Sequence, residues 1–332
     1  MALIYQHVFL ILFISVIPIS QSVVLDPDYY KTTCPDFNRV VLEQVQEKQA
    51  KFVTTAAATL RLYFHDCMTG GCDGSILIGS TSDNQAEKEY EDNISLPGDA
   101  FDIIFRIKTA LEMICPGVVS CADILTAATR NLLVIVGGPH YPVLLGRKDG
   151  LVSNASRVNG SLPHEGMNVD QMIAFFERRG FTTQEMVALL GAHTIGFASC
   201  KKFSKRLFNF SAEAPTDPGL KPAYAEALKK LCGDPKTFDT TAAFNDVKTP
   251  GKFDNAYYKN LPKGLGLLAT DNLLYQDLRT RPFVELYAAN ETAFFKDFGN
   301  AMVKMSYIEV KTDGDPNGEV RRRCDAFNTA AA

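Results

Sequence analysis

The chain has 332 residues, with 34 Lys and Arg against 38 Asp and Glu, which gives a formal net charge of −4. This slightly acidic balance, without a basic run, argues against nucleic acid as a partner. Roughly 310 residues would remain after removal of the N-terminal leader described below, enough to bury a large core in one domain or two lobes.

Residues 1–22 have the features of a secretory signal peptide. Val8 to Ile19 is almost wholly apolar but short for a bilayer span, and Ser20-Gln21-Ser22 supplies the small-x-small pattern of a cleavage site. The alternative is a membrane anchor, but we see no later segment long and apolar enough to span. We predict a secreted mature chain that begins near Val23 and has no membrane partner.

Eight cysteines in the predicted mature chain support export. An even number behind an export signal is typical of a disulfide framework, although spacing alone does not resolve the pairing. Five N-x-S/T sequons also fit a secreted glycoprotein. The sequons begin at Asn93, Asn154, Asn159, Asn209 and Asn290.

Apolar residues recur at helical spacing over most of the chain, so we expect a mostly helical protein with at most a short hairpin. Cys115-Pro-Gly and Gly137-Gly-Pro are clear helix stops. The capping-box pattern from Thr182 to Glu185 opens another helix. Residues 140–168 and 211–222 are expected to be loops. The predicted helices are 39–52, 53–65, 100–114, 120–136, 169–179, 185–193, 253–261, 280–289 and 292–305.

The most informative stretch is LRLYFHDCMTGGCDGSIL, residues 60–77. Arg61 and His65 are four apart and share one helix face, and a guanidinium beside an imidazole is an unusual pair to bury. The alternative is a helix-end arginine and a hydrogen-bonded core histidine. The next turn favours a functional site, because Asp66, Asp73 and Ser75 offer the hard oxygen ligands that Ca²⁺ prefers.

A second histidine, His193, lies in GAHTIG at the end of the capped apolar helix. Of the five histidines, His7 lies in the leader, and His140 and His164 lie in loop sequence. His65 and His193 are therefore the two on buried-looking helices. One histidine as an axial metal ligand and another, beside an arginine, as an acid–base group is a division of labour typical of haem.

The chain resembles the secreted plant haem peroxidases of class III over essentially the whole mature sequence. LRLYFHDC with GCDGS, VVSCADIL, GGP, LGRKDG, LLGAHTIG and FDNAYYKNL follow in the family's order and spacing, together with all eight cysteines. The resemblance implies a mostly α fold in which two helical lobes sandwich one haem b. The distal lobe would cover residues 23–167 and the proximal lobe 168–310, with the C-terminal segment tied back by Cys324.

The resemblance also implies the roles of the haem-site residues. His193 would bind the iron on the proximal side, and Asp271 would accept its other N–H, which makes the ligand more basic. The implied distal residues are the base His65, the cation Arg61, the amide Asn93 that orients the base, and Phe64 against the haem.

Two Ca²⁺ ions, four disulfides and a donor site are implied in the same way. The first ion would be held by Asp66, Thr69, Gly71, Asp73 and Ser75, with Glu87 in an outer shell. The second would be held by Thr194, Asp246, Thr249, Asp254 and the carbonyl of Lys252. The bridges would be Cys34–Cys115, Cys67–Cys72, Cys121–Cys324 and Cys200–Cys232. Pro163 would present its carbonyl to an aromatic donor at the haem edge.

The expected activity is reduction of hydrogen peroxide to water with one-electron oxidation of phenolic donors. Haem would supply the electron chemistry, while a neutral His65 moves the peroxide proton and Arg61 stabilises the charge that develops as the O–O bond breaks. We expect a monomer, secreted to the cell wall or, as an alternative, delivered to the vacuole. Its partners would be hydrogen peroxide and small phenols.

Two other functions are alternatives to a peroxidase. A non-catalytic haem-binding glycoprotein of the same fold would be expected to have lost Arg61 or His65, and both are present. A calcium-stabilised hydrolase without haem has no support, because neither a Gly-x-Ser-x-Gly nor a His-Glu-x-x-His pattern occurs. Departures from the family pattern put haem-propionate contacts and local packing in question. They are Tyr141 in place of Trp, Met68 in place of Phe, Ala58 and Leu96 near the usual serines, and Asp99 where Arg-Gly-Phe is usual.

Overall fold

The computed structural model describes residues 25–328, so the predicted signal peptide over residues 1–22 lies outside the described residues. The described chain is mainly helical, which confirms the predicted fold class. Two short antiparallel pairs, β1 (Asp149–Gly150) with β4 (Gly318–Glu319) and β2 (Phe197–Ser199) with β3 (Ala242–Phe244), are its sheets. The α-helices are α1 Phe37–Lys51, α2 Thr55–Met68, α3 Gly98–Ile114, α4 Cys121–Ile135, α5 Val169–Glu177, α6 Thr183–Leu190, α7 Cys200–Leu207, α8 Pro222–Leu231, α9 Ala256–Asn260, α10 Ala269–Gln276, α11 Arg281–Ala289 and α12 Glu291–Met305.

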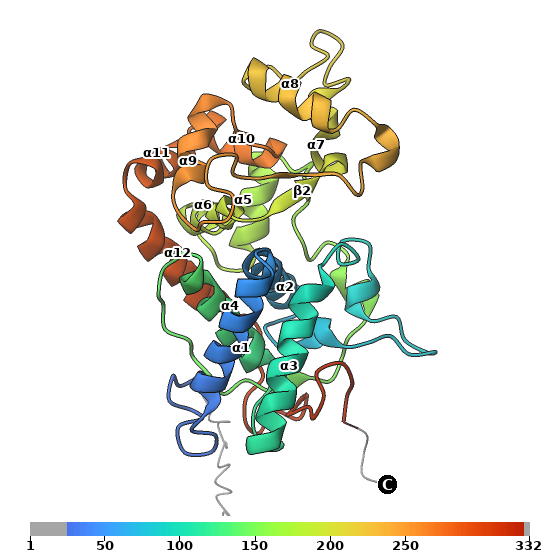
Figure 1. The fold of residues 1–332 in the computed structure, drawn as a ribbon, viewed down its shortest axis with the longest axis vertical. Coiled ribbons are helices and arrows are strands. Elements are labelled where there is room, and N and C mark those ends of the chain that lie inside the picture. The colour runs from blue at the N-terminus through green and yellow to red at the C-terminus, as the bar shows by residue number, and fades with distance from the viewer. Residues whose placement is uncertain (1–24, 329–332) are drawn as a thin grey trace, which may run out of the picture.

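Helices α1 to α4 gather in one half of the molecule, and α5 to α11 form the other half (Figure 1). The segment after α12 returns to the first half, where β4 pairs with β1. Arg321 in this segment is fully buried and donates from its guanidinium to the carbonyls of Asp73 and Gly74, at 3.1 and 2.7 Å. The segment from β4 to Arg321 is therefore part of the packing around the first half.

One continuous hydrophobic core joins the two halves, and a smaller second core lies under α7 and α8. Helix α2 packs against α3 and α4, while α6 packs against α5 and α12. Because α2 and α6 are packed on several sides, the side chains that they carry are held in fixed positions. Helices α7, α8 and α10 were not predicted from the sequence.

Local sequence accounts for the start of α6 but not for its end. Thr182 accepts a hydrogen bond from the Glu185 N–H, and the Glu185 carboxylate accepts one from the Thr182 N–H, as the capping-box pattern predicts. The α-helix was expected to continue to His193, and this was wrong. It ends at Leu190, and residues 191–194 form a 3₁₀ turn in which Gly191 lies so close to Tyr258 and Phe294 that a side chain has no room.

All eight cysteines are paired. The bridges are Cys34–Cys115, Cys67–Cys72, Cys121–Cys324 and Cys200–Cys232, the four pairs that the resemblance implies. The third bridge fastens the C-terminal segment to the start of α4. Within residues 25–328, no helix combines the length and the apolar character needed to cross a bilayer.

Candidate active site

One face of α2 is more accessible than the rest of the helix. Ala57, Arg61 and Phe64 are only partly buried, while most of their neighbours in α2 are buried. These three positions follow i, i+4, i+7 spacing, so they lie along one stripe of the helix. The other sides of α2 are covered by α3 and α4. The stripe therefore borders a region that the protein core does not fill.

His65 lies beside this stripe in a chain of directed hydrogen bonds. The Arg61 Nε donates to His65 Nε2 at 3.3 Å. Because a guanidinium has only donors, Nε2 must be the acceptor, and the ring proton lies on Nδ1. Nδ1 then donates to the Asn93 Oδ1 at 2.6 Å, and the Asn93 amide donates to the Glu87 carbonyl at 2.8 Å. The bonds present the Nε2 lone pair toward Arg61.

The surroundings of His65 keep its imidazole neutral. Burial, followed by the positive charge of Arg61, lowers the pKa of His65 to about 3, against a smaller opposing effect of the Asn93 hydrogen bond. The ring is 8% exposed. At neutral pH it is therefore an uncharged base, the state needed to accept a proton.

Arg61 is fixed by a loop that the sequence did not indicate. Its guanidinium donates to the Ser95 carbonyl at 3.1 Å, to the Ser95 Oγ at 2.8 Å and to the Asp92 carbonyl at 3.3 Å. Burial lowers the pKa of Arg61, but a guanidinium remains protonated at neutral pH. Ser95, next to Leu96, thus contacts the Arg61 guanidinium, and no spacing rule predicts this contact.

His193 has a carboxylate partner instead of an amide. Its Nδ1 lies 2.8 Å from the Asp271 Oδ1, and the Asp271 side chain is fully buried. Burial alone would lower the pKa of His193, but the charge and the hydrogen bond of Asp271 outweigh it, so the pKa lies above its usual value. Nδ1 is occupied, which leaves Nε2 as the nitrogen that can bind a metal.

His193 and the accessible stripe of α2 border the same region. The charge of Arg61 acts on the pKa of His193, so the two side chains lie within electrostatic range. A Cβ placed on Gly196, just after the His193 turn, would lie 3.4 Å from the Ala57 Cβ. Although burial is the largest influence on its pKa, the His193 side chain is 31% accessible. A deep ring can be accessible only where it borders an unfilled space, and these residues therefore fit a flat group such as haem between them.

The loop after α2 folds around Asp66. The Asp66 carboxylate accepts from the Gly74 N–H at 2.9 Å and the Ile76 N–H at 3.3 Å. The Ser75 Oγ donates to Glu87 at 3.0 Å. The structure thus brings together most of the residues predicted for the first calcium ion: Asp66, Asp73, Ser75 and Glu87. The predicted ligand Thr69 contacts the Ser161 hydroxyl at 2.9 Å, and Gly71 has a φ of 112° that favours glycine.

Negative charge is crowded in this loop. Burial, with the charge of Asp73, raises the pKa of Asp66, and burial raises the pKa of Glu87 to about 8. The Lys311 ammonium lies 2.5 Å from Asp73, and Arg157 lies 2.9 Å from Glu87. A divalent cation would relieve this crowding, although it would share Asp73 with the ammonium group.

The residues predicted for the second calcium ion also converge. The Thr249 hydroxyl lies 3.0 Å from Asp246 and 3.1 Å from Asp254, and the Thr194 hydroxyl lies 3.5 Å from Asp246. Asn260 donates to Asp246 at 2.7 Å, a contact that was not predicted. The predicted carbonyl ligand belongs to Lys252, whose ammonium lies 3.5 Å from Asp254. In residues 25–328 no three His, Cys, Asp or Glu side chains form a metal-binding group, so hydroxyl and carbonyl oxygens would have to complete either site.

The loop that contains Pro163 is tied to the end of α2. Arg179 donates to the carbonyls of Met68 and Ser161, at 3.2 and 2.7 Å, and the Ser161 hydroxyl meets that of Thr69. Pro163 itself is half-buried. The loop therefore lies next to the α2 segment that carries His65, but it contributes no residue to the hydrogen-bond chain of His65.

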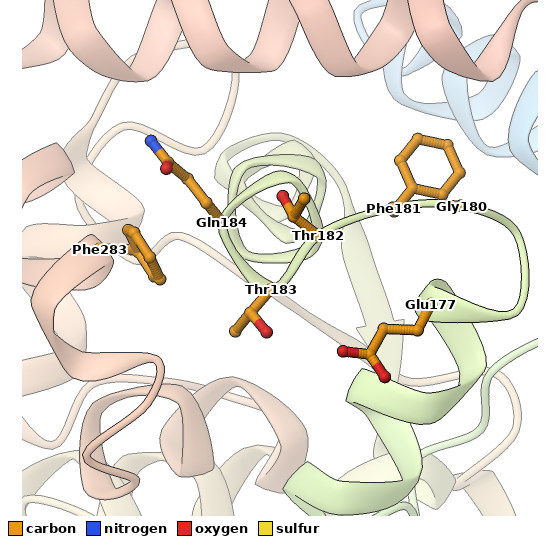
Figure 2. A pocket seen from close by; sticks show the side chains of 7 residues that line it. All are labelled: Glu177, Gly180, Phe181, Thr182, Thr183, Gln184 and Phe283. Atoms are coloured by element: carbon orange, nitrogen blue, oxygen red, sulfur yellow. The ribbon is translucent and has the colours of Figure 1, made fainter.

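An open depression elsewhere on the surface is not part of this site (Figure 2). It lies at the start of α6, the opposite end from the His193 turn. The Thr182 side chain and the Glu185 carboxylate already use the hydrogen-bonding groups of this helix end. The lining residues are Glu177, Gly180, Phe181, Thr182, Thr183, Gln184 and Phe283. Nothing in this set resembles the chemistry around the two histidines.

Comparison with known proteins gives matches over most of the chain. A family model described as peroxidase matches residues 41–290. Peroxidase 65 of Arabidopsis thaliana is 57% identical over 305 residues, which covers 92% of this chain and 90% of the relative. Peroxidase 41 of the same plant is 58% identical over 304 residues, with 92% and 91% covered. Peroxidase 51 is 46% identical over 310 residues, with 92% and 93% covered. The matched region contains both histidines and their partners Asn93 and Asp271.

Proposed function

This chain belongs to the peroxidase family and is a peroxidase, and we propose that it works with one haem b held between His65 and His193. The relatives' names favour peroxidase activity over the non-catalytic haem-binding alternative. The observation that best supports this proposal is that His65 and His193 have different hydrogen-bond partners. His65 donates to an uncharged amide and is kept neutral by burial and by Arg61, whereas a carboxylate makes His193 a more basic ligand. This contrast matches the needs of a proton-transfer base and a metal ligand.

The distal residues would handle the proton and the charge of hydrogen peroxide. When bound, haem supplies the electron chemistry of peroxide reduction. His65 accepts the peroxide proton at Nε2 and returns it to the departing oxygen, while Asn93 holds the Nδ1 proton in place. Arg61, 3.3 Å from Nε2, stabilises the negative charge that develops on oxygen as the O–O bond breaks. Phe64, on the accessible stripe, would pack against the haem face.

On the proximal side, His193 would bind the iron through Nε2. Asp271 fixes the ring orientation through Nδ1 and raises the basicity of the ligand. Asp271 is itself held by two further donors, the Tyr257 hydroxyl at 2.9 Å and the Leu268 N–H at 3.4 Å. These partners favour a rigid ligand, which is the property that haem attachment needs.

We also propose a Ca²⁺ ion at each of the two oxygen-rich loops. The distal loop starts at Asp66, next to His65, and the proximal site includes Thr194, next to His193. Each ion would therefore hold the neighbour of a functional histidine. The convergence of buried carboxylates and hydroxyls supports this proposal.

Phenolic donors are proposed to reach the haem edge beside the loop of residues 161–164. Proline has a fixed φ and no N–H, so the Pro163 carbonyl has a well-defined direction for a phenol hydroxyl. Replacing Pro163 by Gly should change the apparent affinity for small phenols and spare the peroxide step. Lost peroxide reactivity with unchanged phenol kinetics would place the donor site elsewhere.

We further propose that the protein is a glycosylated monomer that is secreted. Delivery to the vacuole is the alternative destination. Asn159, Asn209 and Asn290 are exposed and suit glycans. Asn93 is 2% exposed and hydrogen-bonded to His65, so its sequon has no room for a glycan.

The decisive experiment combines spectroscopy with turnover. The haem-loaded protein should show a Soret band and should oxidise guaiacol only when hydrogen peroxide is present. A Soret band without peroxide-dependent turnover would support the non-catalytic binder. Turnover by protein without haem would refute the assignment of the two histidines.

A further inference from the structure

Asp271 accepts two hydrogen bonds on one and the same oxygen. The His193 Nδ1 lies 2.8 Å from Oδ1, and the Tyr257 hydroxyl lies 2.9 Å from that oxygen. Among residues 25–328, the one hydrogen-bond donor to the other oxygen, Oδ2, is the Leu268 N–H, at 3.4 Å. The phenol therefore shares the oxygen that the histidine uses, although a less occupied oxygen is present on the same carboxylate.

Tyr257 is held in place for this contact. Its side chain is 1% exposed, and its ring meets the His193 ring edge to face, with 6.0 Å between centroids and an interplanar angle of 88°. A phenol has an ordinary pKa of ~10, so the Tyr257 hydroxyl carries its proton at neutral pH. A protonated phenol beside a carboxylate acts as a hydrogen-bond donor.

Two donors on one oxygen divide its negative charge. A charge-assisted hydrogen bond from the phenol draws electron density from the carboxylate, which weakens the pull of Asp271 on the Nδ1 proton. The imidazole then has less anionic character and gives less electron density to a metal on Nε2. Removal of the phenol hydroxyl would have the opposite effect.

We propose that Tyr257 is a positioning residue that moderates the donor strength of His193 by sharing the Asp271 oxygen. It thereby makes the reduction potential of the bound iron less negative than the His193–Asp271 pair alone would make it. This inference rests on the proposed function, in which His193 binds haem iron. It assigns a separate role to the tyrosine, whose hydroxyl donates to Asp271.

The neighbouring tyrosine provides a matched control. Tyr258 follows in the same helix, α9, and is also fully buried. Its hydroxyl donates to the Val187 carbonyl at 2.8 Å instead of to Asp271. Tyr257→Phe and Tyr258→Phe each delete one buried hydroxyl from adjacent positions, so a general loss of packing or of stability should affect both.

The test measures the Fe(III)/Fe(II) potential and the Fe–His stretching frequency of the ferrous protein. Tyr257→Phe should shift the reduction equilibrium toward Fe(III) by up to about tenfold, which is ~59 mV for one electron, and should raise the Fe–His frequency. Tyr258→Phe should leave both values unchanged. Replacement of Tyr257 by 3-fluorotyrosine, a stronger donor of nearly equal size, should shift both values in the opposite direction.

Opposite shifts for the phenylalanine and fluorotyrosine proteins would support the inference, because a packing defect does not change sign with donor strength. Wild-type values in both, with an Fe–His band still present, would overturn it and leave the proposed function intact. Equal shifts for Tyr257→Phe and Tyr258→Phe would also overturn it. Absence of any Fe–His band in the unmodified protein would instead refute the proposed function.

Discussion

His65 and His193 differ in the group that receives the proton on Nδ1 and in the charges nearby. His65 donates to an uncharged amide, and burial with the charge of Arg61 lowers its pKa to about 3. His193 is paired with a buried carboxylate, and its pKa rises. The surroundings of the two rings thus favour different tasks, a neutral base at His65 and an electron-rich ligand at His193.

The largest expected effect comes from removal of the ligand. His193→Ala should abolish stable haem binding, because it removes the only protein bond to iron in the proposed site. The ratio of Soret to protein absorbance after haem loading measures the loss. His140→Ala, at an exposed loop position, is the control and should bind haem normally. Normal Soret absorbance in His193→Ala would refute the proposal that His193 binds the haem iron.

Removal of the base should have a different result. His65→Ala should retain haem and lose about 10²–10⁴-fold in the rate of the peroxide step, the usual contribution of general acid–base catalysis. Stopped-flow mixing with hydrogen peroxide gives this rate. If both histidine variants lost haem equally, the contrast between the two sides would be wrong.

Calcium removal should reduce activity before it unfolds the chain. Each proposed ion holds the residue next to a functional histidine, and misplacement of roughly 1 Å can cost about 10²-fold in rate. The disulfides, worth about 2–4 kcal/mol each, should still maintain the fold. Chelation followed by circular dichroism and peroxide kinetics separates the two effects. An unchanged peroxide rate in verified calcium-free protein would contradict the proposal.

The comparison can also be tested by giving His65 the kind of partner that His193 has. In Asn93→Asp a carboxylate should raise the pKa of His65 from about 3 toward or above the ordinary ~6.5. A histidine is protonated below its pKa, so the base would be lost as the pH falls through this value. At pH 5 the peroxide rate should drop by about 30-fold for a pKa of ~6.5, while Asn159→Asp on the surface should follow the original profile. If the peroxide rate of Asn93→Asp still falls only near pH 3, the partner on Nδ1 does not control the pKa of His65.

Helices with a strong apolar pattern could be predicted from the sequence, and short polar ones could not. The start of α6 can be predicted because Thr182 and Glu185 form a capping box within four consecutive residues. Helix α7 reads CKKFSKRL, with few apolar residues to reveal a period, and it forms because Phe203 and Leu207 reach a second core built with α8. Its stability is a tertiary property, which local propensity does not contain.

In the candidate site, too, contacts between residues close in sequence could be predicted, and contacts between distant residues could not. Arg61 and His65 are four residues apart on one helix, so their contact follows from helical geometry. Asn93 lies 28 residues beyond His65, and Asp271 lies 78 residues beyond His193. Only the resemblance to a family pairs residues at such separations. Tyr257 lies within the family motif FDNAYYKNL, but no sequence rule connects its hydroxyl to Asp271.

The half of the molecule that contains α1 to α4 cannot finish folding until the C-terminal segment, which is synthesised last, has been made. Arg321 supplies hydrogen bonds to the carbonyls of Asp73 and Gly74, and Cys324 closes a bridge to Cys121 across 203 residues. A nascent chain that has reached the end of α12 already contains both histidines and their hydrogen-bond partners. It still lacks Arg321 and Cys324, which support the loop that follows His65. A stop codon just before Arg321 would therefore remove these supports and leave the sequence of both histidine sites untouched.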